Sequence, residues 1–561
     1  MITLYIQCIL VVIYFTTFGY PFKNHSKNIS VYASQLIYGS ILMSFMALII
    51  NFFLPLNKYI NTIFLLISLF ILIKFRKTYY TKSFFFYLFS SSFIIFLLIV
   101  ESDVYRPDAG LYHLPYINIL NNEKIIFGLA NLHFRYGHIS IMQYLSAISN
   151  NLLFGINGIV FAQALIASAV ITNFLYFLHR YNKKKLYNIH FFYLFSILLF
   201  VFFKMIRYSE YGNDAPSHFI LFFLVSELLR EKNFNPDKLC NFLILSGFII
   251  FNKITLLFAA FIPLYILLIN KNKIFVIFKL VKFYFLLIFI FFWFLKNFIV
   301  SGCVVFPVKS TCFKFVEWNS LKIAKKISQE NESWTKGWPD YELKVTKNNE
   351  TLMNIEDYSK NFKWVKYWYE GHFKEKIVKI LIPYLLILVL FFYIFKEKKS
   401  KNFRKNFKDN SLIYLIIILT IATAFWLIKI PVFRYGYSYF ISLFSVLFGY
   451  LCCKNNVKIN NIYKNINIFL FLCLLVFIGK NTIRISNSAN DYENYPWPKY
   501  FNMNNNNSSP EIKEFFINDL ILYKPVNDGF CMYYKSPCGH YGERDLSKIY
   551  NKFSYTFIIA K

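Results

Sequence analysis

The sequence predicts an all-α, polytopic membrane protein with about fourteen transmembrane helices, in a range of roughly 11 to 14. Of the 561 residues, 57% are hydrophobic and 21% aromatic, and only 16% are charged. A soluble globular protein carries more charge than this. Apolar runs of roughly 17 to 25 residues, long enough to cross about 30 Å of hydrocarbon, recur along the whole chain. Together these observations argue against a soluble fold.

Each apolar run predicts one membrane-spanning helix. The first run lacks the charged start and the small-residue cleavage site of a signal peptide, so we expect a helix there. The predicted spans are residues 3–19, 31–53, 58–74, 84–100, 156–178, 189–206, 217–230, 239–252, 254–270, 276–300, 377–395, 411–428, 436–453 and 465–480.

Basic residues orient these helices. The net charge of +32 is concentrated in short breaks between the apolar runs, as expected for loops that face the cytoplasm and anionic headgroups. No basic stripe is interleaved with stacking aromatic residues in a soluble module, which argues against nucleic-acid binding. The main basic breaks are Lys74, Arg76, Lys77 and Lys82; Arg180 and Lys183–Lys185; Lys271 and Lys273; and the run that starts at Lys396.

Alternation from these loops places four segments on the outer side of the membrane. All but five of the 29 acidic residues fall in or beside these segments, so we expect the polar chemistry on the outer side. The predicted organisation is a transmembrane module, 1–300, with outer loops 101–155 and 207–216; an outer loop, 301–376; C-terminal transmembrane helices, 377–480; and an outer segment, 481–561.

Four of the nine cysteines form two close pairs in the outer segments, Cys303 with Cys312 and Cys531 with Cys538. An oxidising compartment favours a disulfide in each pair. Zinc is the competing interpretation for these four residues. It is weaker, because neither pair has the spacing or the companion histidine of a zinc finger.

The outer loop 101–155 contains the most concentrated group of ionisable residues. Carboxylates and imidazoles at a membrane surface suit proton abstraction, and arginine suits phosphate oxygens. The competing interpretation is that these are solvated loop charges. The candidate site residues in this loop are Glu101, Asp103, Asp108, Tyr112, His113, Asn131, His133, Arg135 and His138.

Further candidate residues lie at the outer ends of later spans. Asp214 belongs to a turn so short that it must lie near the membrane surface, although it would equally serve to cap the following helix. Lys253, Lys429 and Arg434 lie at outer ends, against the inward bias of positive charge. A half-buried cation needs a partner, and an anionic ligand such as a lipid phosphate would supply one. Snorkelling to headgroups is the alternative.

The stretch "DAGLY", Asp108 to Tyr112, resembles the acidic motif in the first large outer loop of the GT-C glycosyltransferases. That resemblance implies membrane-parallel helices in the loop, a polyprenyl-phosphate sugar donor, and a second acidic motif at Asp214. It also implies donor-phosphate binding by basic residues at later helix ends, here Lys253, Lys429 and Arg434. The chain is also similar to an uncharacterised bacterial membrane family with the pattern "LYH", "NLHFRYG" and a C-terminal "PC".

One departure from the GT-C motif bears on metal binding. Ala109 stands where many of these enzymes have a second acid. The resemblance therefore implies no required cofactor, and a divalent metal is doubtful unless Glu101 or Asp103 substitutes for that acid.

The function that the resemblance implies is an inverting sugar transfer at the outer face of a bacterial inner membrane. Asp108 would be the base, and the other residues of its loop and Asp214 would position the donor and a glycan, lipid or protein acceptor. The alternatives are an O-antigen-type polysaccharide polymerase or ligase, and a lipid-linked glycan flippase or transporter. Four tryptophans of the loop 301–376 either stack on sugar or lie at the membrane interface, namely Trp334, Trp338, Trp364 and Trp368.

Overall fold

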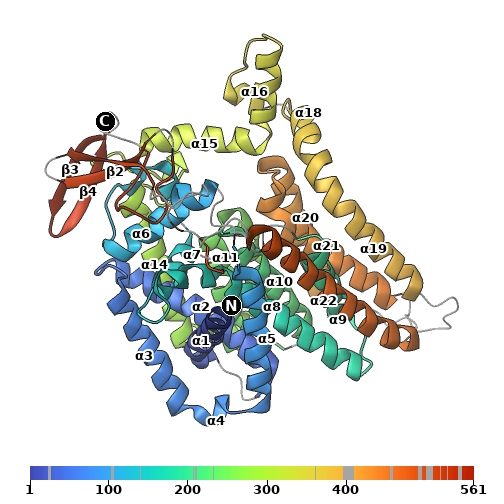
Figure 1. The fold of residues 1–561 in the computed structure, drawn as a ribbon. Coiled ribbons are helices and arrows are strands. Elements are labelled where there is room, and N and C mark those ends of the chain that lie inside the picture. The colour runs from blue at the N-terminus through green and yellow to red at the C-terminus, as the bar shows by residue number, and fades with distance from the viewer. Residues whose placement is uncertain are drawn as a thin grey trace.

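Helices make up most of the protein (Figure 1). This computed structural model describes residues 1–22, 27–102, 107–138, 140–205, 208, 211–231, 233–360, 362–395, 410–454, 459–489, 496–498, 500, 510–517, 520–526, 529–540 and 546–561.

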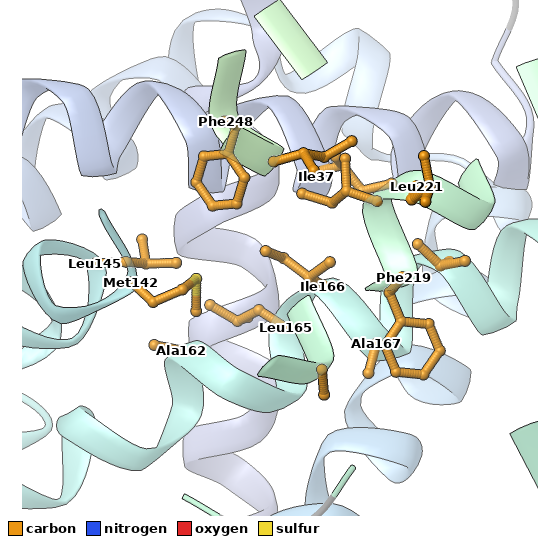
Figure 2. Packing of buried hydrophobic residues seen from close by; sticks show 14 of the residues in the cluster. Ile37, Met142, Leu145, Ala162, Leu165, Ile166, Ala167, Phe219, Leu221 and Phe248 are labelled. Atoms are coloured by element: carbon orange, nitrogen blue, oxygen red, sulfur yellow. The ribbon is translucent and has the colours of Figure 1, made fainter. Parts of the chain in front are cut away.

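The helices of the first 300 residues pack around one apolar core. At the centre of this core α2, α7, α8, α10 and α11 meet, and Ile37, Leu145, Leu165, Phe219 and Phe248 interdigitate there (Figure 2). The helices are α1 (Ile2–Phe18), α2 (Ile29–Asn51), α3 (Lys58–Lys74), α4 (Arg76–Tyr79), α5 (Lys82–Ile99), α6 (Leu114–Asn122), α7 (Ile141–Ser149), α8 (Gly158–Lys183), α9 (Ile189–Phe203), α10 (Asp214–Arg230), α11 (Pro236–Asn252), η6 (Ile254–Ala260), α12 (Phe261–Ile269), α13 (Ile274–Ile277) and α14 (Val281–Ser301).

The rest of the chain adds an outer group of shorter helices and a second set of long helices, which pack beside α9 (Figure 1). The outer group is α15 (Leu321–Thr335), α16 (Trp338–Lys347), α17 (Ile355–Ser359) and α18 (Val365–Trp368). The long helices are α19 (Lys379–Phe395), α20 (Asn410–Lys429), α21 (Phe433–Lys454) and α22 (Ile459–Ala489).

Each of the fourteen predicted runs coincides with helix in the structure, although the ends differ and the run 254–270 is divided between η6 and α12. Eight of the described helices are long and apolar enough to cross a membrane, or nine if the bent pair Ile254–Ile269 and Lys271–Ile277 counts as one span. Helices such as α1, with 17 residues, and α9, with 15, fall short of the length that spans about 30 Å. The protein is therefore a helical membrane protein, whereas fourteen spans stay a prediction.

The four predicted outer segments contact one another. Phe127 exchanges backbone hydrogen bonds of 2.9 and 2.8 Å with Thr556 and Ile558. The Tyr211 hydroxyl donates to Ser146 Oγ at 3.1 Å. These contacts place the segments on the same side of the helical core. Two helices of nine residues, α6 and α7, lie in the first loop, and their orientation parallel to the membrane stays a prediction.

The C-terminal segment departs from the all-α class. It contains two antiparallel hairpins, β1 (Ile512–Ile517) with β2 (Leu520–Pro525), and β3 (Leu546–Lys552) with β4 (Tyr555–Ala560). Their strands are rich in Ile, Phe and Tyr, which favour the pleated conformation. Phe127 pairs with Phe557 of β4, so the second hairpin is anchored to the first outer loop.

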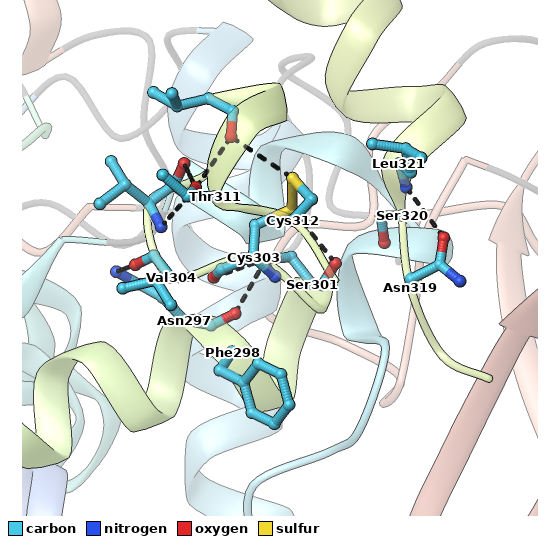
Figure 3. The surroundings of a disulfide bond; sticks show 12 residues. Asn297, Phe298, Ser301, Cys303, Val304, Thr311, Cys312, Asn319, Ser320 and Leu321 are labelled. Carbon is cyan, nitrogen blue, oxygen red and sulfur yellow. Dashed lines mark hydrogen bonds between the residues drawn. A yellow bond between two sulfur atoms is a disulfide. The ribbon is translucent and has the colours of Figure 1, made fainter. Parts of the chain in front are cut away.

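Both cysteine pairs form disulfides, Cys303 with Cys312 and Cys531 with Cys538. The first closes a loop directly after α14, where Asn297 donates to the carbonyl of Val304 at 3.1 Å (Figure 3). Each disulfide fixes a loop of an outer segment close to the end of the helical core.

Candidate active site

A cavity of about 480 Å³, called the site cavity below, opens where the outer segments meet the ends of the membrane helices. Its wall combines residues from the first outer loop, the start of α10, the junction of α11 with η6, the end of α15, and the ends of α20 and α21. Nine predicted site residues line it: Asp108, Tyr112, His113, Arg135, His138, Asp214, Lys253, Lys429 and Arg434.

Asp108 lines the site cavity from the start of a helical segment. It directly precedes a π-helical turn, Ala109–His113, which continues into α6. Single π-helical turns within helices are frequent at functional sites. Ala109 is fully buried, and the Gly110 carbonyl accepts a 2.9 Å hydrogen bond from the Met532 amide. The turn is therefore fixed from both sides, while the Asp108 side chain stays 35% exposed.

Four charged side chains form a continuous network in the site cavity. Arg434 Nη1 lies 3.2 Å from Asp108 Oδ2, and Arg434 Nε lies 4.0 Å from Asp214 Oδ2. Lys253 forms an ion pair with Asp214. Two carboxylates and two cations from four separate segments thus alternate along one wall.

The positions of these charged groups at helix ends affect how much each one depends on a partner of opposite charge. Asp214 is the first residue of α10, where the helix dipole favours a carboxylate. Its side chain does not cap the helix, because the cap position belongs to Asn213. Arg434 is the second residue of α21, the end at which the dipole disfavours a cation. The Lys253 side chain is only 7% exposed, so it does not snorkel to the surface.

Burial and charge set the protonation states around this network. Burial alone would raise the pKa of Asp214, but Lys253 and Arg434 outweigh it and hold that pKa at about 2. Burial lowers the pKa of Lys253, and the neighbouring Asp214 carboxylate opposes this shift. Burial lowers the pKa of His113 to about 4. At neutral pH, Asp214 is therefore a carboxylate and His113 an uncharged imidazole.

Two further cations make the site cavity net positive. The Arg135 guanidinium lies 5.5 Å from the Tyr112 ring centre, and no carboxylate of the described residues pairs with it. Lys429 lies 3.8 Å from Glu332. Four cations, Arg135, Lys253, Lys429 and Arg434, thus face three carboxylates, those of Asp108, Asp214 and Glu332. A net positive wall favours an anionic ligand such as phosphate.

Two histidines, the buried His218 and the half-buried His372, hold the backbone at the start of α21. His218 Nε2 donates to the Arg434 carbonyl at 2.9 Å, and its Nδ1 lies 2.7 Å from Ser438 Oγ. His372 Nε2 accepts a 2.8 Å hydrogen bond from the Phe433 amide. The first turn of α21 is therefore fixed on two sides.

Three predicted site residues do not line the site cavity. Asn131 donates to the carbonyls of Trp318 and Ile558, at 3.2 and 3.0 Å, and so joins three outer segments. His133 is buried, and its ring lies 5.0 Å from that of His540. Glu101 is fully buried at the end of α5. These three residues are packed among other outer residues, outside the lining of the site cavity, and their part in positioning donor or acceptor stays a prediction. Asp103 lies outside the described residues.

The contribution of α15 to the site cavity was not predicted from the sequence. Ser328, Asn331, Glu332 and Thr335 all line the site cavity, and their spacing of i, i+3, i+4 and i+7 marks one face of a helix. Asn331 Nδ2 lies 3.3 Å from His138 Nε2. This spacing, inside the predicted outer loop 301–376, was the available signal.

The four tryptophans of this outer segment differ in their surroundings. Trp334 lines the site cavity, is 44% exposed, and lies with its ring 5.7 Å from the Arg434 guanidinium. Trp338 packs against Tyr341 and Tyr358, and Trp368 donates to the Pro431 carbonyl at 2.7 Å. Trp364 is buried. Trp334 is thus the tryptophan placed to stack on a ligand of the site cavity.

The chemistry that these residues offer is proton transfer next to an anion site. A half-exposed carboxylate lies beside a guanidinium, and further cations surround them. Among the described residues, no group of three or more His, Cys, Asp or Glu side chains is arranged to hold a metal ion. Both aspartates of the network are instead paired with cations. That the reaction requires no metal stays a prediction.

Fold and site together define a helical membrane protein with a charged cavity at one end of its helices. Residues 1–441 match a family described as a domain of unknown function, DUF8201. The match covers more than three quarters of the chain, so the chain belongs to that family, and the range includes every residue that lines the site cavity. Comparisons with curated proteins and with solved structures found no match.

Proposed function

We propose that the protein is an integral membrane glycosyltransferase that takes a sugar from a polyprenyl-phosphate donor. The observation that carries this proposal is that Asp108 and the cations Arg135, Lys253, Lys429 and Arg434 line one cavity at the ends of apolar helices. The resemblance of the "DAGLY" stretch to the GT-C acidic motif supports the same reaction.

Asp108 is proposed as the general base. Its side chain is half-buried and 3.2 Å from Arg434. A donor phosphate that binds Arg434 would compete with this pair and leave the Asp108 carboxylate available for a hydroxyl proton. The acceptor oxygen then bonds to the anomeric carbon as the bond from that carbon to the phosphate oxygen breaks. The electron pair stays on the departing phosphate, and the configuration inverts.

The cations of the site cavity are proposed to stabilise the leaving group. The leaving phosphate gains negative charge, so it needs fixed positive charge and no proton donor. Lys253, Arg434 and Arg135 are proposed to stabilise that charge, and Lys429, beside Glu332, adds a further cation to the cavity wall. A general base typically contributes about 10²–10⁴-fold in rate, and the remaining acceleration would come from these cations and from orientation. No step requires a cofactor.

The proposed location is a bacterial inner membrane, with the site facing the periplasm or the outside. The basic breaks favour the opposite ends of the helices for the cytoplasmic face, and two disulfides in the outer segments suit an oxidising compartment. The acceptor would then be a glycan, lipid or protein of the cell envelope.

A polysaccharide polymerase or ligase of the O-antigen type is the second candidate. The observation in its favour is that the outer loop 301–376 supplies a whole helix face to the site cavity, next to His138 and Arg135. Mass analysis of surface glycan from a deletion strain separates the two functions. Loss of one sugar favours the transferase, and loss of chain length favours the polymerase.

Transfer is tested directly with purified protein in liposomes that contain the polyprenyl-phosphate sugars of the host membrane. Release of polyprenyl phosphate, measured by mass spectrometry, should require an envelope extract as acceptor and should fall about 10²–10⁴-fold in Asp108→Asn. Asp340→Asn makes the same chemical change in α16, outside the lining of the site cavity, and should leave release unchanged. Release at the wild-type rate by Asp108→Asn contradicts the assignment of the base.

A further inference from the structure

A second cavity, of about 520 Å³, adjoins the site cavity. The two share Glu332, on α15, and Lys429, at the end of α20. Glu332 accepts a 2.7 Å hydrogen bond from Lys336 and lies 3.8 Å from Lys429. A single carboxylate held between two ammonium groups therefore lies at the junction of the two cavities.

The second cavity faces the outer segments. Its wall consists of residues from α15, α17 and the turn before α18, and only Ile428 and Lys429 come from a long apolar helix. The site cavity, in contrast, includes Ile254, Phe425 and Ile430 at the membrane-helix side. A lipid-linked substrate therefore fits the site cavity, and a water-soluble chain fits the second cavity.

The side chains of the second cavity alternate between donors and acceptors of hydrogen bonds. Gln329 donates to Glu356, whose other carboxylate oxygen lies 3.9 Å from Lys360. Lys336 also donates to the Ser359 carbonyl at 3.1 Å. These side chains can replace their hydrogen bonds to one another with hydrogen bonds to the hydroxyl groups of a ligand. The free-energy cost is small, because the groups are hydrogen-bonded both with and without the ligand.

An exposed aromatic face completes this wall. Phe362 is 65% exposed, although it lines the second cavity. An apolar ring beside alternating donors and acceptors is the combination that binds a sugar, which has one apolar face and a rim of hydroxyl groups. Three ammonium groups, of Lys336, Lys360 and Lys429, face two carboxylates, of Glu332 and Glu356, and each carboxylate is ion-paired with at least one of these ammonium groups.

We propose that the second cavity binds the acceptor as a glycan chain of several sugar units, whose terminal hydroxyl passes Glu332 to reach Asp108. This inference rests on the proposed function, because it names the acceptor class of the same site. Glu356 and Phe362 are assigned as residues that bind the acceptor and take no part in the chemistry.

Equilibrium binding tests the inference without depending on turnover. The probe is a fraction of four to six sugar units, released chemically from the host surface glycan, and a monosaccharide fraction is the comparison. We expect nanodisc-embedded wild-type protein to bind the longer fraction at least tenfold more tightly. Glu356→Gln with Phe362→Ala should abolish this preference, whereas Asp108→Asn should keep it. Glu342→Gln with Phe553→Ala, at positions that line neither cavity, is the matched control and should bind as wild type does.

Kinetics then separate the inference from the proposed function. In the transfer assay, Glu356→Gln with Phe362→Ala should raise the KM for the longer fraction about tenfold and leave kcat and the donor KM unchanged. Equal binding of both fractions by the wild type, an unchanged preference in the variant, or tighter binding of an envelope peptide pool overturns the inference. Length-dependent binding that the variant loses, without any sugar transfer, supports the glycan site and contradicts the transferase.

Discussion

Arg434 Nη1 lies 3.2 Å from Asp108 Oδ2, although the two residues are 326 positions apart in the chain. The arginine is the second residue of α21, and the aspartate directly precedes the π-helical turn before α6. Through Arg434 Nε, the same guanidinium also lies 4.0 Å from Asp214. One cation thus links the two acidic segments of the site cavity, which makes Arg434 the residue through which donor binding and base activation would be coupled.

Replacing Arg434 should therefore affect donor binding and turnover together. In Arg434→Gln we expect kcat/KM for the donor to fall about 10²–10³-fold, as for loss of one charged group that stabilises a transition state. Arg434→Lys keeps the charge but not the planar fork, so an intermediate loss is expected. The measurement is polyprenyl phosphate release against donor concentration. Arg76→Gln, in α4 outside the lining of the site cavity, is the control, and a wild-type donor KM in Arg434→Gln would contradict the role.

The ion pair between Lys253 and Asp214 should contribute to stability chiefly when one partner is missing. The Lys253 and Asp214 side chains are 7% and 21% exposed, so Lys253→Met leaves a carboxylate with less compensation in a buried place. We expect a loss of about 3–5 kcal/mol in unfolding free energy. Lys253→Met combined with Asp214→Asn should recover much of this loss, because no uncompensated charge is then buried.

Thermal unfolding in detergent measures this loss, and a second ion pair supplies the control. Lys282 pairs with Asp237 at 2.8 Å, but the Asp237 side chain is 51% exposed. Lys282→Met should therefore cost less than about 1 kcal/mol. Equal destabilisation by Lys253→Met and Lys282→Met would show that burial of the first pair has no energetic consequence.

His113, like the buried His133, should make stability fall between neutral and mildly acidic pH. Its pKa is about 4 in the folded protein, against about 6.5 in an unfolded chain. Below pH 6.5 the unfolded state binds a proton that the folded state does not, so the folded state loses stability progressively until the pH reaches about 4. Between pH 7 and pH 5 this amounts to about 2 kcal/mol.

The pH effect is measured as the difference in unfolding temperature between pH 7 and pH 5. In His113→Phe this difference should shrink, since a phenyl ring takes no proton. His179→Phe removes an exposed histidine and should leave the difference as it is in the wild type. An equal difference in all three proteins would rule out His113 as the group responsible.

The bounds of a helix could be predicted from the sequence where a capping residue marks its start and the end of an apolar stretch marks its end. The run 58–74 has the same bounds as α3, because the Asn57 side chain accepts hydrogen bonds of 3.1 and 3.0 Å from Tyr59 and Ile60 and the apolar stretch ends at Lys74. Span number was harder to predict, because short helices such as α9 are as apolar as longer ones, and the sequence does not show which of them cross the bilayer. The hairpins of the C-terminal segment were missed because short strands give a weak periodic signal.

For the site, too, the sequence predicted the positions of single residues but not the contacts between them. Asp108, Asp214, Lys253 and Arg434 were each predicted from their places at outer helix ends, but their contacts depend on how distant helices pack. Glu101 and Asn131 have the same polar character in the sequence as Asp108, and only the fold shows that they are buried outside the lining of the site cavity. Which polar residues line the site cavity depends on tertiary contacts, and these contacts cannot be read directly from a single sequence.

The disulfide Cys531–Cys538 should support catalysis from outside the site cavity. Its loop holds two turns that carry site residues. The Met532 amide donates to the Gly110 carbonyl, two positions after Asp108, and the Tyr136 hydroxyl, next to Arg135, donates to the Cys538 carbonyl. Removing the disulfide that closes this short loop should lower the free energy of unfolding by about 2–3 kcal/mol. Because both turns depend on the loop, we expect a fall in kcat of about tenfold in Cys531→Ser with Cys538→Ser.

Three measurements distinguish this role from a general loss of folding. Far-ultraviolet circular dichroism should stay as in the wild type, because the helices do not depend on the C-terminal segment for their hydrogen bonds. A reducing agent should lower wild-type activity, and it should lower the activity of Cys453→Ser, which changes a cysteine outside the two disulfides, to the same extent. The serine double variant should begin at the lower rate without any reductant. A wild-type kcat in that variant would show that the two turns keep their places without the disulfide.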